Sequence, residues 1–459
     1  MALFYNIVVQ TVIERSHMNN TINLINLKEN DVESIDTARK EKTLYIYLTL
    51  KKVKEICPSC GTLEYKIKDY KTRKINHPIL NDENCIIVYR QRRYICDTCR
   101  KTFYEKNPFF KSNKSYSSYT RLRVLKELKT PETTFKRVAE NCNLNVNTVI
   151  DIFDDLGIAK RLPLPEILCI DEFYDPSTGV GKYNCILMNF KNSQIVDILS
   201  DRTKNYLGKY FQAIPKKERD NVKHISIDMW EPYKDIAITY FNKAIISVDP
   251  FHVIEHINTA LKKVRVRIMK KYDSKSDEYY LLKHFNWLLN KSFFKLKDGE
   301  TELNRRLNLY LNNVSTLDLL LKIDDELKYS YDLKERYLSF NKLKNKEFAA
   351  EQLNEIINEY KISGINEFIE VASTLKHWKE EIINSFSFYN DRKITNGPIE
   401  SKNGTIRKIL SNGNGYTNFQ RERNRIFYCF NNQWIADPLL ENIKIKRKGK
   451  PRGKYKKTR

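Results

Sequence analysis

Two short apolar runs, each carrying an acid at its end, constrain the fold more than any other feature of the chain. Residues 167–174 read Ile-Leu-Cys-Ile-Asp-Glu-Phe-Tyr after two nearby prolines, and residues 222–230 form a similar run. Such runs predict buried strands. They carry Asp171 and Asp228 to strand ends, where two carboxylates can share a cation. Because strand-terminal aspartates are also ordinary turn residues, each acid alone leaves both interpretations open.

The segments around these runs predict a mixed sheet with helices packed on it. A polar turn with Gly179 and Gly181 follows the first run. We expect strands over 167–174, 182–190, 194–199, 222–230 and 244–248, and helices over 203–213, 232–241 and 251–271. Three strands with hairpin links, followed by alternating helices and strands, form the order used by ribonuclease-H-like nucleases.

A fold of this kind takes a third catalytic carboxylate from a later helix, and Glu400 is the candidate. Pro398 is a natural first helical residue, which places Glu400 in the first turn. A glutamate there also stabilises its helix by facing the amino-terminal dipole. The spacing alone does not separate a helix cap from a metal ligand.

Four of the nine cysteines form two CxxC knuckles, Cys57 with Cys60 and Cys96 with Cys99. Thiolates at this spacing reach one tetrahedral Zn²⁺, and two knuckles complete its coordination. Strand-like segments near 64–68 and 86–94 predict a zinc ribbon with a long hairpin. Two alternatives remain open: redox-active CxxC pairs, or a site in which Cys85 or His77 replaces one ligand.

Three short helices are predicted over 121–128, 134–140 and 147–156. In a helix-turn-helix, Ala139 would be the small packing residue, Asn143 the turn residue tolerant of positive φ, and Val149 a core residue. The recognition helix would then begin with three residues that face base edges: Asn145, Asn147 and Thr148. Three small helices also occur as a plain connector, so the pattern leaves that alternative open.

Several longer motifs give the chain a family resemblance. They lie at 170–173, 226–233, 248–258, 396–407 and 415–419. In this order they resemble the transposases of the ISL-three family of bacterial insertion sequences, over about residues 57–433. The family carries a zinc ribbon at the place of the cysteine knuckles, and the resemblance favours the helix-turn-helix over a connector.

The resemblance implies a catalytic triad of Asp171, Asp228 and Glu400, which would bind two Mg²⁺ ions, with Mn²⁺ as a possible substitute. Asp249 is a rival for the second ligand, and it reads equally well as a helix cap. The order of strands and the family motif both favour Asp228. Asp249 and His252 are then neighbours of the site.

The fold class expected is multidomain α/β. The predicted parts are an N-terminal segment of unclear fold (1–50), a zinc ribbon (51–112), a helix-turn-helix (113–160), a ribonuclease-H-like domain (163–271 and 387–436), an all-helical insertion (272–386) and a basic tail (437–459). Aromatic residues of the insertion, including Trp287 and Trp378, are expected in its core. Residues 44–50 alternate well enough for a strand.

A large excess of positive charge predicts a nucleic-acid partner. Lys and Arg number 81 against 57 for Asp and Glu, a net charge of +24, which suits a polyanion. The last residues, 444–459, hold ten Lys or Arg and no acid, a pattern typical of a sequence-independent phosphate binder. Further DNA contacts are predicted from the two C-terminal helices: Asn403, Arg407, Arg421, Arg423 and Arg425.

The sequence carries no apolar run near the ~20 residues that span a bilayer, and its start lacks a secretory signal. We therefore expect no membrane partner and a location in the bacterial cytoplasm, on the nucleoid when bound to DNA. The expected partners are transposon ends with inverted repeats and target DNA, bound by a dimer or higher oligomer.

The function predicted is that of a DDE transposase, which cleaves DNA and transfers the freed strand. Two alternatives remain. In a DNA-binding regulator, the zinc ribbon and helix-turn-helix would carry the function and the sheet would be inert. A structure-specific nuclease would use the same acids without strand transfer.

Overall fold

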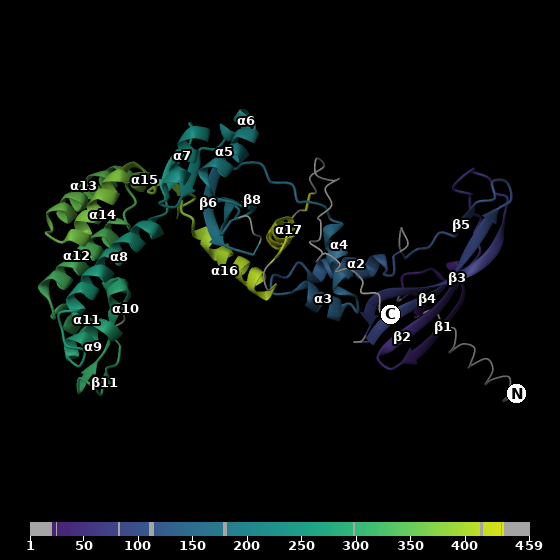
Figure 1. The fold of residues 1–459 in the computed structure, drawn as a ribbon, viewed down its shortest axis with the longest axis horizontal. Helices are drawn as coiled ribbons and strands as arrows, with labels where there is room; N and C mark the ends of the chain where they lie inside the picture. The colour runs from purple at the N-terminus through teal and green to yellow at the C-terminus, as the bar shows by residue number, and fades with distance from the viewer. Residues whose placement is uncertain are drawn as a thin grey trace, which may run out of the picture.

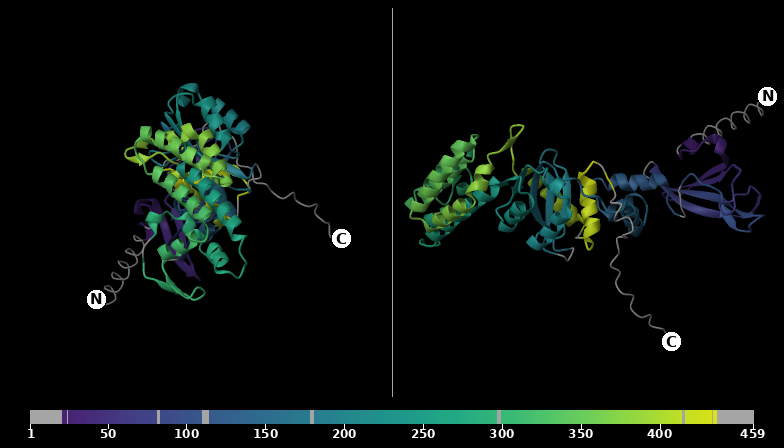
Figure 2. Two further views of the ribbon diagram at one scale, coloured as in Figure 1. Left: turned by 90° about the vertical axis from the view of Figure 1, so that its left-hand side faces the viewer. Right: turned by 90° about the horizontal axis from the view of Figure 1, so that it is seen from above.

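The protein is elongated, with its parts in a row (Figure 1). A computed structural model describes residues 21–23, 25–80, 83–109, 114–177, 181–296, 299–413, 416–432 and 434–435. The tail, the first twenty residues, Gly179 and Gly415 lie outside these ranges. A strand-rich part lies at one end, and a body of helices lies at the other; Figure 2 shows the same order from a second side.

The N-terminal part is a five-stranded sheet. Its strands are β1 (Val32–Lys40), β2 (Thr43–Leu50), β3 (Tyr65–Leu80), β4 (Glu83–Cys96) and β5 (Thr102–Tyr104), with the 3₁₀ turn η1 (Glu29–Asp31) before them. The long β3–β4 hairpin is antiparallel, and β2 pairs with β4 in parallel. The expected strand over 44–50 is therefore present. Residues 32–50 belong to the same sheet as the β3–β4 hairpin, because β2 pairs with both β1 and β4. Ile46, Ile75 and Ile87 share its apolar core.

Three helices follow: α2 (Ser118–Glu127), α3 (Phe135–Asn141) and α4 (Val146–Asp154). Asn143, in the turn between α3 and α4, has φ of 50°, which an asparagine tolerates better than most residues. Ala139 and Val149 are buried in the core of the three helices. All three residues thus lie where the helix-turn-helix pattern requires them, and the assignment of that motif stays a prediction.

The central sheet has the order β10-β9-β6-β7-β8. Its strands are β6 (Ile167–Tyr174), β7 (Tyr183–Asn189), β8 (Ile195–Leu199), β9 (His224–Ile227) and β10 (Ile245–Val248). The first three are antiparallel, and β9 and β10 run parallel to β6. This is the mixed sheet predicted from the sequence. The predicted strand over 222–230 is shorter in the structure, where β9 covers only His224–Ile227.

Helices cover both faces of this sheet. Leu168 and Ile170 pack with α5 (Lys204–Ala213), α7 (Glu231–Tyr240) and α8 (Pro250–Met269), near the short α6 (Lys216–Arg219). Cys169 and Phe173 belong to the opposite core, with α16 (Gly397–Asn412) and α17 (Phe419–Phe430). Successive strand residues point to opposite faces, so β6 contributes to both cores.

The insertion packs on the long helix α8, and both share one apolar core. It contains α9 (Asp277–His284), α10 (Asn286–Asn290), the 3₁₀ turn η2 (Phe293–Lys295), α11 (Asn313–Leu321), α12 (Asp325–Phe340), α13 (Lys346–Ile362), α14 (Asn366–His377) and α15 (Lys379–Asn384). A small hairpin, β13 (Phe388–Tyr389) with β14 (Arg392–Lys393), leads back to the sheet.

Two expectations for the insertion are wrong. It is not all helical, because β11 (Glu302–Asn304) and β12 (Leu309–Leu311) form a hairpin. Trp378 is buried as predicted, but Trp287 is 38% exposed. The Lys291 ammonium lies 4.5 Å from the Trp287 ring centre, so this tryptophan contacts a cation and water instead of the core.

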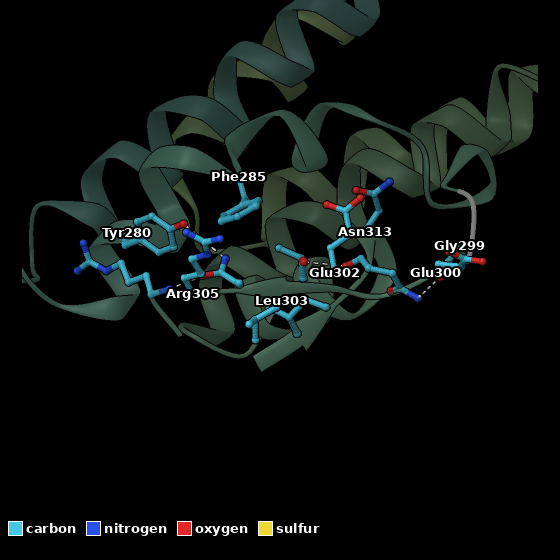
Figure 3. A pocket seen from close by; sticks show the side chains of 13 residues that line it. Tyr280, Phe285, Gly299, Glu300, Glu302, Leu303, Arg305 and Asn313 are labelled. Carbon is cyan, nitrogen blue, oxygen red and sulfur yellow. Dashed lines mark hydrogen bonds between the residues drawn. The ribbon is translucent and has the colours of Figure 1, made fainter. Parts of the chain in front are cut away.

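The β11–β12 hairpin walls a cavity of about 660 Å³ (Figure 3). Arg306 braces this wall: its guanidinium donates to the carbonyls of Lys275 and Ser276 at 2.7 and 2.9 Å and stacks on Tyr280. An isolated two-stranded hairpin is marginally stable, which explains the need for such a brace. The hairpin lies at the far end of the helical body from the central sheet (Figure 1).

Helix α17 joins the central sheet to the three N-terminal helices through Arg425. This side chain is fully buried. Its guanidinium donates to the carbonyl oxygens of Leu128, Thr130 and Thr133, which surround the turn between α2 and α3. A buried arginine that satisfies three carbonyls holds the two parts in register.

We predict that Arg425→Ala lowers the free energy of unfolding by about 3 kcal/mol or more, because breaking a buried charge network leaves its partners unsatisfied. Thermal unfolding followed by circular dichroism measures the loss. Arg407→Ala is the matched control, since that arginine is exposed. Equal unfolding temperatures for the two variants would show that the carbonyls find other partners.

Candidate active site and metal centres

The four predicted cysteine ligands form one cluster. All four sulfur atoms lie within 4.8 Å of one another. Cys57 Sγ is 3.7 Å from Cys99 Sγ, and Cys60 Sγ is 3.6 Å from Cys96 Sγ. A tetrahedron with Zn–S bonds of about 2.3 Å has sulfur atoms about 3.8 Å apart. The donor set therefore fits a structural zinc ion.

The two knuckles have the same backbone form. The residue after each second cysteine has positive φ, 76° at Gly61 and 59° at Arg100. Each of these residues donates its N–H to the carbonyl of the first cysteine, at 2.9 and 3.1 Å. The turns therefore aim both thiol pairs at one point.

The alternative ligands Cys85 and His77 lie elsewhere. They face each other on β4 and β3, away from the knuckles. Cys85 belongs to the apolar core of the sheet, and His77 Nδ1 lies 3.1 Å from Ser117 Oγ. Neither residue belongs to the sulfur cluster, which consists of the four knuckle cysteines.

We predict one Zn²⁺ per chain, measured by metal analysis of the purified protein. Cys96→Ser combined with Cys99→Ser should lose it, because two ligands cannot close a tetrahedron. Cys85→Ser, which alters a cysteine outside the cluster, should retain the metal. Zinc retained by the double variant would refute the site.

The second candidate centre forms where β9 ends beside β6. Strand β9 pairs with β6 only as far as Ser226 opposite Cys169. Asp171 therefore lies beyond the last paired residues on this side, and Asp228 follows β9 directly. Oxygen atoms of Asp171, Asp228 and Glu172 lie within 4.8 Å of one another. The two predicted acids do meet, and a third acid meets them.

Hydrogen bonds from α16 and its start orient the two aspartates. Asn396 Nδ2 donates to Asp228 Oδ1 at 3.1 Å and to the Ile170 carbonyl at 3.0 Å. Asn403 Nδ2 donates to Asp171 Oδ2 at 3.2 Å. Helix α16 thus fixes both carboxylates before any cation arrives.

Asp249 has a different role from its predicted rival, Asp228. One carboxylate oxygen accepts the Phe251 N–H at 2.9 Å, and the other accepts the Asn396 N–H at 2.6 Å. Both oxygens therefore serve backbone groups, at the start of α8 and before α16. His252, on the same helix, places Nε2 3.0 Å from Asp228 Oδ1.

Crowding of the acids changes their titration. Burial and the neighbouring Asp228 raise the pKa of Asp171 to about 8. Burial opposes charging of His252, but the hydrogen bond and charge of Asp228 prevail and raise its pKa to about 9. Burial also raises the pKa of Glu172, against the hydrogen bond from Tyr233 and the charge of Arg202. Such a site favours the arrival of a cation.

Glu400 lies in the first turn of α16, as predicted, and is exposed. Its carboxylate does not belong to the compact group formed by Asp171, Glu172 and Asp228. The charges of the cluster still act on it. Partial desolvation of its carboxyl and the charges of Asp249 and Asp228 raise the pKa of Glu400, while the charge of His252 lowers it. The structure therefore brings Asp171 and Asp228 of the predicted triad together and leaves Glu400 outside their compact group, in the first turn of α16.

The predicted DNA contacts divide into two groups. Asn145, at the start of α4, and Asn147 are exposed, and Thr148 is half-buried. The Asn145 side chain accepts the Asn147 N–H at 2.8 Å, so it caps the helix. Arg407 is exposed. These residues are accessible to DNA.

The remaining predicted contacts are corrected by the structure. Asn403 is buried and binds Asp171. Arg421 is bound to Asp154, with its side chain 11% exposed. Arg423 and Arg425 are buried, the former bonded to Asp197 and the latter to backbone carbonyls. These three arginines join parts of the protein and are not available to DNA.

Sequence reasoning missed the roles of Glu172 and Asn396. Glu172 adjoins Asp171, and strand alternation sends neighbouring side chains to opposite faces, so strand periodicity alone does not place it in the cluster. Asn396 immediately precedes the Gly397-Pro398 helix start. The signal in the sequence was an asparagine directly before a helix start, because a side chain at that point is held in a fixed position by the helix.

A family model described as "Transposase", for DDE enzymes of the ISL3 type, matches residues 168–426. The chain belongs to the ISL3 transposase family. A second model of that family, "zinc-finger of transposase IS204/IS1001/IS1096/IS1165", matches residues 54–99. The chain is also similar to the "Transposase for insertion sequence element IS1001" of Bordetella parapertussis, with 21% identity over 382 residues, 82% of this chain and 88% of the relative.

These matches cover both candidate centres of this ISL3 family member. The longer match includes both aspartates and Glu400, and the shorter one includes all four cysteines of the knuckles. Among the helices that the structure describes, none has the length and apolarity required to cross a membrane.

We predict that Mg²⁺ raises the thermal unfolding temperature of the protein by offsetting repulsion between Asp171 and Asp228. The rise should grow from about pH 6 to about pH 8.5, because a proton held by Asp171 competes with the cation and leaves as the pH passes its raised pKa. Differential scanning fluorimetry measures it. Asp228→Asn should lose most of the rise. An equal rise in wild type and variant would place the ion elsewhere.

Proposed function

We propose that this protein is an active DNA transposase, which cleaves the ends of its insertion sequence and transfers the freed 3′ strand to target DNA. The observation that carries the proposal is the meeting of the Asp171 and Asp228 carboxylates beside the helix of Glu400. Family membership supports the same class of reaction.

The donor set fits Mg²⁺, which prefers oxygen ligands and keeps several waters, and Mn²⁺ would serve in its place. When bound, a pair of divalent ions supplies an activated nucleophile and stabilises the leaving oxygen. In our proposal Asp171, Asp228 and Glu400 would hold these ions. Asn396, Asn403 and the Asp228 partner His252 keep the aspartates oriented.

DNA binding is assigned to the N-terminal parts and the exposed basic residues. Asn145, Asn147 and Thr148 would contact base edges of the terminal repeats from the start of α4, which enters the major groove. Arg407 and the basic tail would bind phosphates. The net charge of +24 favours such a partner. Cleavage of two ends calls for a dimer or higher oligomer, acting in the bacterial cytoplasm.

The cost of the acid pair argues against an inert regulator. Two buried carboxylates side by side lose hydration and repel each other, and both effects raise the pKa of Asp171. Replacing either acid with an amide would relieve that repulsion. A protein that only bound DNA would gain stability from such a change, whereas a nuclease needs the charges to bind its cations.

We predict that Glu400→Gln abolishes Mg²⁺-dependent nicking while folding and DNA binding persist. A glutamine keeps a helix start almost as well as glutamate, but it removes one negative charge from a site that holds two divalent ions. The assay compares nicking of a labelled duplex, taken from the DNA that flanks the coding region, with binding of the same duplex in a gel.

Glu351→Gln is the matched control, since Glu351 is exposed on α13, in the insertion. Asp171→Asn and Asp228→Asn should behave like Glu400→Gln. Nicking by Glu400→Gln at the rate of the control would leave this residue a helix cap and remove it from the active site.

A further inference from the structure

Two aromatic rings pack against an arginine beside the acid cluster, and a third ring packs against one of them. The Arg202 guanidinium carbon lies 4.2 Å from the Tyr183 ring centre and 4.5 Å from that of Trp230. Tyr174 stands against Tyr183, with ring centres 5.4 Å apart and planes at 70°. We call Tyr174, Tyr183, Arg202 and Trp230 the aromatic cluster.

The cluster is open to solvent. Tyr174 is 55% exposed, Tyr183 is 36% exposed, and Trp230 is half-buried. Tyr174 and Tyr183 are paired across β6 and β7 at the strand ends. Exposed aromatic rings gathered at one place on a protein surface mark a binding site more often than scattered ones do.

Glu172 joins the aromatic cluster to the acids. Its carboxylate forms an ion pair with Arg202 and accepts the Tyr233 hydroxyl at 2.8 Å. It also belongs to the group of oxygen atoms shared with Asp171 and Asp228. A molecule that stacks on the aromatic cluster therefore lies next to the carboxylates of Asp171 and Asp228.

The chemistry of the cluster selects a flat, polarizable partner. Glu172 already balances the charge of Arg202, so the cluster is not simply a phosphate site. Aromatic rings and a stacked guanidinium bind the faces of nucleobases with little regard to sequence. The face of a base is covered inside a duplex and becomes accessible only when the base leaves the stack. Lys182, which precedes Tyr183 in the sequence, is exposed and suits the DNA backbone.

We propose that the aromatic cluster holds a nucleobase that has left the duplex at the transposon end, adjacent to the reacting phosphodiester. This inference rests on the proposed function and adds a positioning site to it. Tyr174 supplies the exposed stacking face, while Arg202, held by Glu172, fixes the rings around it. The cluster thereby sets which phosphodiester reaches Asp171 and Asp228.

The test is a double-mutant cycle in which one change is made in the protein and the other in the DNA. Full-length wild type, Tyr174→Ala, Tyr174→Phe and Tyr310→Ala are compared in single-turnover nicking with Mg²⁺. Tyr310 is a matched control, because it is 69% exposed on β12 at the far end of the insertion. The duplexes carry one abasic nucleotide, moved step by step across the cleavage position.

Tyr174→Ala should slow nicking of the intact end about 10-fold, the order expected for loss of base–aromatic stacking, while Tyr174→Phe and Tyr310→Ala stay near wild type. On the duplex that lacks the held base, wild type should slow by a similar factor and the effect of Tyr174→Ala should vanish, which is the mark of a direct contact. Gel binding of the end should change little.

Two outcomes overturn the inference and leave the proposed function intact. In the first, Tyr174→Ala nicks the intact end at the wild-type rate. In the second, Tyr174→Ala slows nicking by the same factor on every abasic duplex, wherever the missing base lies. A different result marks failure of the proposed function itself. In that case wild type shows no Mg²⁺-dependent nicking of the intact end and does not differ from Asp171→Asn.

Discussion

The candidate site is built around two carboxylates, those of Asp171 and Asp228, which the fold brings together despite their repulsion. Asp171 lies where β6 continues beyond the pairing with β9, and Asp228 lies where β9 has just ended. Burial strengthens their interaction, because little water screens it. The raised pKa of Asp171 records this cost. A protein tolerates such a cost where a cation or a reaction requires the charges.

Hydrogen bonds fix the elements around the two acids to one another. Asn396 reaches both Asp228 and the backbone of β6, and Asp249 accepts the Asn396 N–H, so the start of α16 is fixed to the sheet at both points. Glu400 follows one helical turn later. The buried Arg425 then fixes α17 to the helix-turn-helix. Arg423, on the same helix, is bonded to Asp197 of β8, so α17 links the three N-terminal helices to the sheet that carries the acids.

Much of this arrangement was predictable from local sequence. Apolar runs gave the strands of the central sheet, and Asn143 gave the tight turn, because backbone geometry limits what can stand there. Cysteine spacing predicted the sulfur cluster for a similar reason. In each case the physical constraint acts on neighbouring residues.

Burial by distant segments was harder to foresee. Arg421, Arg423 and Arg425 resemble a basic DNA-binding helix in sequence, yet α17 lies between parts of the protein and its arginines are bonded to acids and carbonyls there. Glu172 and Asn403 depend on how strands and helices meet, which periodicity does not reveal.

The most direct test of the central claim is the position of Mn²⁺ in crystals of the protein bound to an end duplex, located by anomalous scattering. The account predicts ions bound by oxygen atoms of Asp171, Asp228 and Glu400, with α16 bringing Glu400 to the aspartates. An ion held by Asp171, Glu172 and Asp228 while Glu400 stays in solvent would contradict it, as would the absence of any ion between the two strands.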